Sequence, residues 1–141
     1  MEIKELVSFS EEYVGALDAL MRELSPEAAA TEDRVRKCIA DEDTHQYAVF
    51  EDGRMVGGAT LCVCTTPEMV LGFVEAVVVT AACRGHHLGR KLMERVIDDA
   101  RRFGVQHLHL TSSPKRIAAN GLYLSMGFQR KETNVYVLNI N

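Results

Sequence analysis

The chain has 141 residues, a length typical of one domain spanning residues 1–141. Its composition is 47% hydrophobic and 26% charged, with 10 Gly and 3 Pro, which excludes a disordered, collagen-like or low-complexity chain. The longest apolar stretch, residues 73–83, is about half a membrane span, and the first residues lack a secretion signal. We therefore expect a cytoplasmic protein that does not bind a membrane and whose four cysteines are free thiols.

Charge is distributed unevenly along the chain. Residues 1–83 carry 16 acidic and 6 basic side chains, whereas residues 84–141 carry 4 and 10. This asymmetry predicts partners of opposite sign on different parts of one domain, unless the charges intermix on folding. The isoelectric point of about 5.7 argues against a duplex nucleic-acid partner.

The first third of the chain predicts one strand and two helices. A strand is expected over residues 2–7, and a nearby serine can cap the helix that follows. Apolar residues then recur at helical spacing until Ser25-Pro26 ends the pattern. A shorter helix begins at Thr31 and ends at the acidic run 41–43.

The next segments predict strands. Residues 46–51 and 55–64 are rich in β-forming residues and are joined at Asp52-Gly53, the pair that a tight hairpin turn requires. Residues 70–80 are almost continuously apolar. Such a run is typical of a strand covered on both faces, and we expect it to form the middle of the sheet.

The last third predicts a strand–helix–strand unit and a final helix. A helix from Leu88 ends at Gly104, and residues 105–110 form a strand parallel to the 70–80 strand. Ser113-Pro114 supplies a cap and a first-turn proline for a helix to about residue 126. Residues 129–140 then offer one or two strands. The order is β-α-α-β-β-β-α-β-α-β(-β), an α/β domain with a mixed sheet.

The turn from the 70–80 strand into the following helix has the features of a pyrophosphate site. The first turn of a helix carries unpaired N–H groups and the positive end of the dipole, and the glycines let a ligand approach. Basic side chains surround it, although an ordinary turn with a solvated basic face would look the same. The expected binding residues are Val77, Val78, Val79, Arg84, Gly85, His86, His87, Leu88, Gly89 and Arg90.

This segment resembles the pyrophosphate-binding motif of the GNAT superfamily of acyl-coenzyme A N-acyltransferases, [Q/R]-x-x-G-x-[G/A]. Arg84 fills its first place and Gly89 its last, but His87 stands where the middle glycine is usual. A Cβ there is tolerable if the residue is already helical, and the imidazole could donate to a phosphate. The P-loop and dinucleotide-binding patterns are absent.

A second segment extends the resemblance. Residues 118–123 read A-A-N-G-L-Y and are followed by Gly127-Phe128, similar to the family's A-A-N-x-L-Y segment that ends with G-F. The resemblance implies the acyl-coenzyme A N-acyltransferase fold, with acetyl-coenzyme A as cosubstrate between two splayed parallel strands. It assigns Asn120 to cofactor contact and Tyr123 to cofactor contact and to the acid that protonates the departing thiolate.

The implied reaction is attack of a primary amine on the acetyl thioester in a ternary complex, which needs a proton acceptor. Glu75 is the best candidate, since it shares a strand face with Phe73 and Val77, whose apolar surroundings suit proton transfer near neutrality. Other roles stay open for both residues. Glu75 could act through water or pair with an arginine, and Tyr123 could be a packing residue with a satisfied hydroxyl. The acidic first half predicts a cationic acceptor, either a small molecule or a peptide.

Other groups of histidine and cysteine residues give weaker evidence for a functional site. His107 and His109 share a strand face but have no third residue spaced to complete a metal site, and none is expected. Cys62 and Cys64 would form an acyl-cysteine only beside a base, so packing is the better interpretation. A non-catalytic acyl-coenzyme A binding or regulatory module and a module for another nucleotide are the alternative functions. Small domains of this kind often pair through sheet edges, so a homodimer is one open arrangement.

Overall fold

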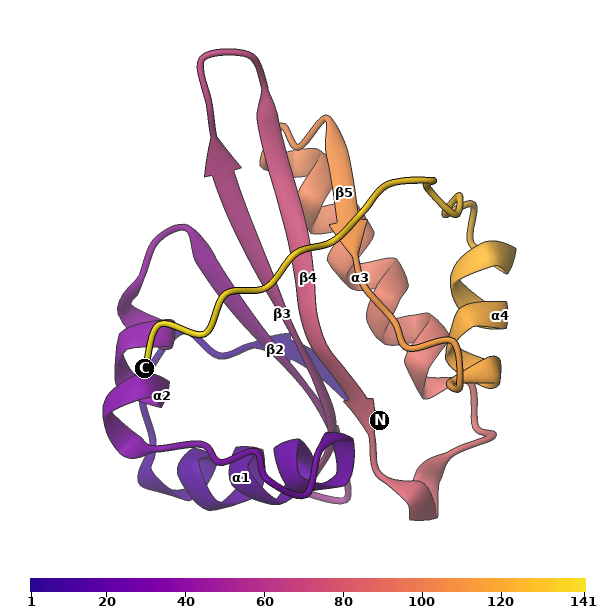
Figure 1. Ribbon diagram of the computed structural model, residues 1–141. Helices are drawn as coiled ribbons and strands as arrows, with labels where there is room; N and C mark the ends of the chain where they lie inside the picture. Colours follow the sequence, from indigo (N-terminus) through magenta and orange to yellow (C-terminus); the bar gives the residue numbers. More distant parts are fainter. The chain divides into compact units, whose positions relative to one another are not determined.

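The computed structural model describes residues 1–141, which divide into two compact units, residues 1–111 and residues 112–141. The first unit contains a five-stranded sheet and three α-helices (Figure 1). No helix of the structure combines the length and the apolar character that a membrane crossing requires.

The elements of the first unit follow the predicted order. The strands are β1 (Glu2–Glu5), β2 (Thr44–Glu51), β3 (Arg54–Thr65), β4 (Val70–Val79) and β5 (His107–Leu110), and the helices are α1 (Glu11–Leu24), α2 (Glu32–Ala40) and α3 (Leu88–Arg102). A three-residue 3-10 helix, η1 (Ala81–Cys83), lies between β4 and α3.

The sheet has the order β1-β2-β3-β4-β5, antiparallel except for the parallel pair β4 and β5. The predicted strand–helix–strand unit is therefore confirmed, and so is the hairpin, in which Asp52 and Gly53 both have positive φ. The prediction that residues 70–80 form the middle of the sheet is wrong, because β3 has that place. Phe73 and Glu75 of β4 are exposed, so this strand is not covered on both faces.

The helices α1 and α2 pack on one face of the sheet and α3 on the other (Figure 1). The Tyr47 hydroxyl donates to Asp99 of α3, which places Tyr47 on the α3 face. The neighbouring Gln46 accepts from Cys38 of α2, which places it on the opposite face. Leu92, Met93 and Val96 of α3 are fully buried, so that face carries the tighter core.

The second unit contains α4 (Ile117–Ser125). The prediction that Ser113-Pro114 caps this helix is wrong, because the helix begins two residues after a turn at Pro114-Lys115, with Arg116 as its N-cap. Gly127, with φ of 98°, ends it as predicted. Residues 129–140 form no strand, contrary to prediction. A strand exists only where its backbone finds a partner, and β5 pairs with β4 alone.

Candidate functional site

The loop that joins β4 to α3 contains four of the predicted binding residues. It runs from Thr80 through η1 to His87, and Arg84, Gly85, His86 and His87 are all exposed. The Arg84 Nε donates to the carbonyl oxygen of Val79 at 3.2 Å, which holds the guanidinium beside the end of β4. The loop therefore presents its polar groups to solvent next to the start of a helix.

Two residues of this loop have left-handed backbone conformations. Gly85 has φ of +87° and His87, the N-cap of α3, has φ of +61°. His87 is therefore not helical, so the condition under which its Cβ would be tolerated as part of the helix is not met. A left-handed residue suits glycine best, and among other residues asparagine, aspartate and histidine take it most often. Here the left-handed conformation is taken by a histidine.

The first turn of α3 provides the positive end of a helix. It comprises Leu88, Gly89 and Arg90, and it contains no acidic residue. Backbone N–H groups of a first turn lack partners within the helix and favour an anion there. Leu88 is buried and fixes the helix on the sheet, while Gly89 and Arg90 are half-buried. The arrangement suits a phosphate group.

The strand β4 changes its pairing just before this loop. Thr60 of β3 pairs with Glu75, but Gly58 pairs with Val78, so β4 has one extra residue between these pairs. Ala76 takes φ of +52° at this β-bulge. The bulge was missed from the sequence, because nothing in an apolar run marks which residue is unpaired.

The other edge of β4 is partly open. β5 pairs with β4 only from Leu71↔His107 to Val74↔Leu110. Residues 75–79, which include the predicted Val77, Val78 and Val79, therefore have no partner strand on that edge. Backbone groups at such an edge are available to a ligand.

Glu75 lies at the start of this open edge, with an exposed side chain. The apolar surroundings expected for it are therefore not provided by residues 1–111, although Phe73 lies two residues away on the same face. Glu75 also affects the pKa of the Cys62 thiol. Burial raises this pKa most, and the negative charges of Glu75 and, next, Asp41 raise it further. Asp41 and Glu75 are thus both close to Cys62, on the face that carries α2.

The two predicted residues of α4 differ in their surroundings. The Asn120 Nδ2 donates to the carbonyl oxygen of Ser113 at 3.0 Å, so this amide braces the turn before the helix. Tyr123 is 6% exposed and packs edge-on against Phe128, with 5.8 Å between ring centroids. Burial raises the pKa of its phenol, an effect that Arg116 partly opposes. The phenol is therefore protonated at neutral pH.

The histidine and cysteine groups do not form a metal site. The rings of His107 and His109 lie 6.4 Å apart, and His109 stacks on Phe73. No three metal-ligating side chains of the structure lie together. The four cysteines are free.

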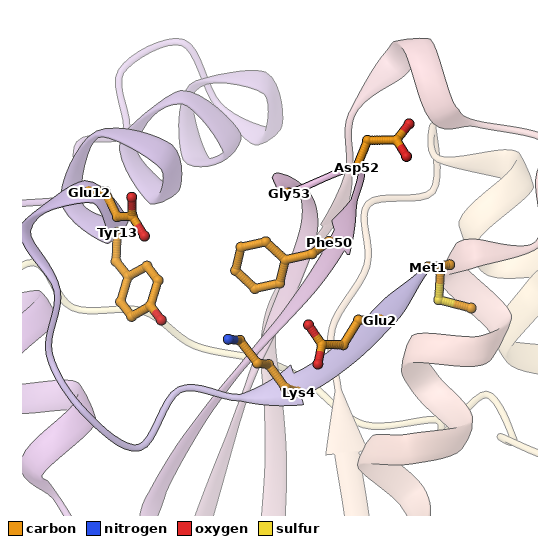
Figure 2. Close-up of a pocket in the computed structure, with 8 residues that line it drawn as sticks. All are labelled: Met1, Glu2, Lys4, Glu12, Tyr13, Phe50, Asp52 and Gly53. Atoms are coloured by element: carbon orange, nitrogen blue, oxygen red, sulfur yellow. The ribbon is translucent and has the colours of Figure 1, made fainter.

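Two cavities lie in the first unit, on either side of Phe50. One, of about 360 Å³, lies between β1, the start of α1 and the β2–β3 hairpin, where the Lys4 Nζ lies 5.0 Å from the centre of the Phe50 ring (Figure 2). The other, of about 420 Å³, continues along α1 to Thr80. Neither is lined by a residue predicted to bind or react.

Comparison with known proteins identifies the family. A sequence profile described as the acetyltransferase (GNAT) family matches residues 8–128. The chain is 29% identical over 143 residues to glucosamine 6-phosphate N-acetyltransferase 1 of Oryza sativa subsp. japonica, covering 93% of this chain and 81% of the relative.

Solved structures share the fold. Glucosamine-6-phosphate N-acetyltransferase from Arabidopsis thaliana superposes with a TM-score of 0.81 at 20% identity, covering 97% of each chain. The aminoglycoside N-acetyltransferase AAC(6')-Iy in complex with CoA superposes with a TM-score of 0.81 at 15% identity, covering 99% of this chain and 95% of that one. With its left-handed loop ahead of α3 and its profile match over most of its length, this chain belongs to the acetyltransferase (GNAT) family.

Proposed function

We propose that this protein transfers the acetyl group of acetyl-coenzyme A to a primary amine in a ternary complex. The observation that carries the proposal is the loop before α3, where two left-handed residues and an acid-free helix start create a cradle for phosphates. Acetyl-coenzyme A supplies the acetyl group as a thioester. A solved GNAT relative, AAC(6')-Iy, was determined in complex with CoA, which supports the same cosubstrate here.

The residues of the loop fit a diphosphate. The backbone N–H groups of Leu88 and Gly89 and the positive end of α3 would hold its oxygens, with Arg84 adding a guanidinium. The left-handed backbone of Gly85 and His87 turns the loop around that space. The open edge of β4 at residues 77–79 offers backbone groups to the rest of the cosubstrate. Asn120, whose Nδ2 is engaged with Ser113, has its Oδ1 left to accept a hydrogen bond.

Two side chains are proposed to move protons. Glu75 accepts the proton of the attacking amine, directly or through water, and its exposed carboxylate lies at the open edge of β4. Tyr123 donates the proton that the departing thiolate requires. Burial raises the pKa of its phenol, which keeps the proton in place until it is transferred.

The acceptor is proposed to be a cationic small-molecule amine, such as an amino sugar. The charges of Glu75 and of Asp41, which belongs to the acidic run 41–43, both raise the pKa of the Cys62 thiol. Asp41 therefore adds negative charge near Glu75, the proposed base. Carboxylates there favour a cationic substrate. The relatives named for glucosamine 6-phosphate support an amino sugar, although that sugar also carries an anionic phosphate. The neighbour named as an aminoglycoside N-acetyltransferase supports a cationic amino sugar.

The proposal is tested first by binding and then by turnover. The unfolding temperature of the protein should rise with acetyl-coenzyme A and not with ATP or ADP. Release of free thiol should then follow addition of at least one amine from a panel of amino sugars, aminoglycosides, polyamines and lysine peptides. Stabilisation with no turnover on any amine would favour an acyl-coenzyme A binding module. No stabilisation by acetyl-coenzyme A would reject both functions.

Replacing Tyr123 by Phe tests the proposed acid. Without the phenolic proton the thiolate leaves unassisted, so we expect kcat to fall by about 10- to 1,000-fold. The Kd for acetyl-coenzyme A should stay within about twofold of wild type, because packing of the ring against Phe128 is kept. Tyr136→Phe removes a hydroxyl from an exposed tyrosine of the same unit and is the control. Equal kcat values for both variants would exclude Tyr123 as the acid.

A further inference from the structure

The last turn of α1 is hydrogen-bonded to the start of the loop before α3. The Glu23 Oε2 accepts a hydrogen bond from the Thr80 hydroxyl at 2.7 Å, and its Oε1 accepts one from the backbone N–H of Ala81 at 3.0 Å. Both carboxylate oxygens are therefore used on two successive residues that lie 57 and 58 positions further along the chain. These bonds lower the pKa of Glu23, and the nearby charge of Arg84 lowers it further.

The loop depends on such contacts because it has little packing of its own. The 3-10 helix η1 has three residues and none of them is buried. A segment without buried side chains is ordered mainly by its hydrogen bonds and opens easily when they are lost. The Thr80 N–H donates to the carbonyl oxygen of Val56 at 2.8 Å, so the sheet holds one side of this residue and Glu23 holds the other.

The hydrogen bond between Glu23 and Ala81 also affects the position of Arg84. The N–H of Arg84 donates to the carbonyl oxygen of Ala81 at 3.3 Å, and its Nε donates to Val79 at 3.2 Å. Glu23 fixes Ala81, whose carbonyl group in turn receives Arg84, and its charge attracts the guanidinium. Glu23 thus acts on both the backbone and the side chain of the first residue of the phosphate loop.

We propose that Glu23 is a positioning residue that holds the 80–84 turn in the conformation that binds acetyl-coenzyme A. The inference rests on the proposed function, since it concerns the loop assigned to the cosubstrate. Glu23 itself does not touch the reacting atoms. If the loop leaves its binding conformation for part of the time, the apparent affinity falls by the fraction of time that the conformation is populated.

Glu23→Gln is the decisive variant, because the amide keeps one acceptor oxygen and loses the second acceptor and the charge. We expect the Kd for acetyl-coenzyme A, measured by calorimetry, to rise by about 3- to 30-fold, since hydrogen bonds to a charged group are the strong ones. Glu12→Gln is the matched control. Glu12 lies on the same helix and, like Glu23, lines the cavity of about 420 Å³, but the hydrogen bonds to Thr80 and Ala81 come from Glu23. The Kd of the Glu12→Gln variant for acetyl-coenzyme A should stay within about twofold of wild type.

A positioning role differs from a purely structural one in the kinetics. With an amine that supports turnover in the wild type, Glu23→Gln should raise KM for acetyl-coenzyme A and change kcat by less than about twofold. The denaturation midpoint without ligand should lie only slightly below that of Glu12→Gln, because the two lost hydrogen bonds hold an exposed loop. A loss of kcat, or an equal loss of unfolding stability at saturating and zero acetyl-coenzyme A, would overturn the proposal.

Thr80 provides an independent check. Thr80→Val removes the hydroxyl at constant shape and should also raise the Kd, whereas Thr80→Ser keeps the hydroxyl and should restore a value near wild type. The double variant Glu23→Gln/Thr80→Val should bind more tightly than the product of the two single effects predicts, because one hydrogen bond joins the two residues. Independent effects would contradict the proposal.

The two ideas fail in different ways. If wild-type protein does not bind acetyl-coenzyme A, the proposed function is wrong and the Glu23 variants need not be compared. If wild type binds but Glu23→Gln and Glu12→Gln have equal Kd values, the function stands and the role of Glu23 is wrong.

Discussion

His87 is a non-glycine residue in a left-handed backbone conformation. It takes φ of +61° as the N-cap of α3 and makes no side-chain capping bond. A left-handed conformation costs most L residues about 1–2 kcal/mol, and histidine is among the better tolerated types. The cost is borne at the point where the loop turns into the helix, beside the proposed phosphate site.

Replacing His87 by Gly should therefore stabilise the protein. Relief of the left-handed conformation outweighs the greater freedom of glycine in the unfolded chain, and we expect a gain of about 0.5–1 kcal/mol in urea unfolding. His86→Gly, at a neighbour without positive φ, should lose about the same amount. A loss of stability in both variants would show that the His87 imidazole contributes more than its backbone costs.

Among the elements, α3 is held to the sheet by one buried carboxylate. Asp99 is 2% exposed and accepts hydrogen bonds from Tyr47 of β2 at 2.8 Å and from Arg95 at 3.0 Å, with a third from Arg102. Burial by itself would raise the pKa of Asp99, but the bonds from Arg102, Tyr47 and Arg95 together lower it. Arg95 also donates to the carbonyl oxygen of Ile3 in β1, at 3.2 Å. The network ties three elements together.

Asp99→Asn should lower the free energy of unfolding by about 2–4 kcal/mol, because the amide keeps one acceptor oxygen but loses the second acceptor and the charge that pair with two arginines and a buried hydroxyl. Asp98→Asn, whose exposed side chain contacts only Arg101, should change it by less than about 0.5 kcal/mol. A carboxylate with a lowered folded pKa stabilises above the unfolded pKa. The difference between wild type and Asp99→Asn should therefore shrink below about pH 4. A difference that is constant with pH would contradict this role of the charge.

For the molecule as a whole, the charge asymmetry of the sequence persists in the first unit. The run 41–43 ends α2 and is exposed, and the Asp43 N–H donates to the Asp41 Oδ1 at 2.8 Å. Asp41 and Glu75 both act on Cys62, so charges far apart in sequence meet on one face of the sheet.

Neutralising this run tests whether the negative charge selects the acceptor. The triple variant Asp41→Asn/Glu42→Gln/Asp43→Asn should raise KM for a cationic amine by about 3- to 30-fold and leave the Kd for acetyl-coenzyme A within about twofold. Steady-state kinetics at low and high salt provide the measurement, since salt should raise the wild-type KM towards that of the variant. Glu11→Gln/Glu12→Gln/Glu27→Gln removes equal charge elsewhere. Equal KM values for all three proteins would remove the charge argument.

Local signals in the sequence predicted the local features well. Asp52-Gly53 marks the hairpin because both residues must take positive φ, and both do. Gly104 ends α3, where its φ is +79°. The residues of the loop proposed for phosphate were predicted from the same kind of local signal, a turn and a helix start within one short segment.

Features that depend on distant partners were not predicted. The strands expected over residues 129–140 do not form, although their alternating residues suit a sheet, because alternation does not provide a partner edge. The extra residue at Ala76 is defined only by its pairing with β3. The exposure of Glu75 depends on which elements cover β4, and apolar neighbours in sequence do not reveal that.

The amino-acid sequence alone determined the family, the order of the elements up to α4 and the loop proposed for acetyl-coenzyme A, since each depends on residues close together in the chain. Only the tertiary structure decided that β3 is central, that Glu23 holds Thr80 and Ala81, and that Asp99 joins α3 to β2. Such contacts join residues about 50 or more positions apart. They are chosen by the packing of the whole sheet and its helices, so no local pattern records them.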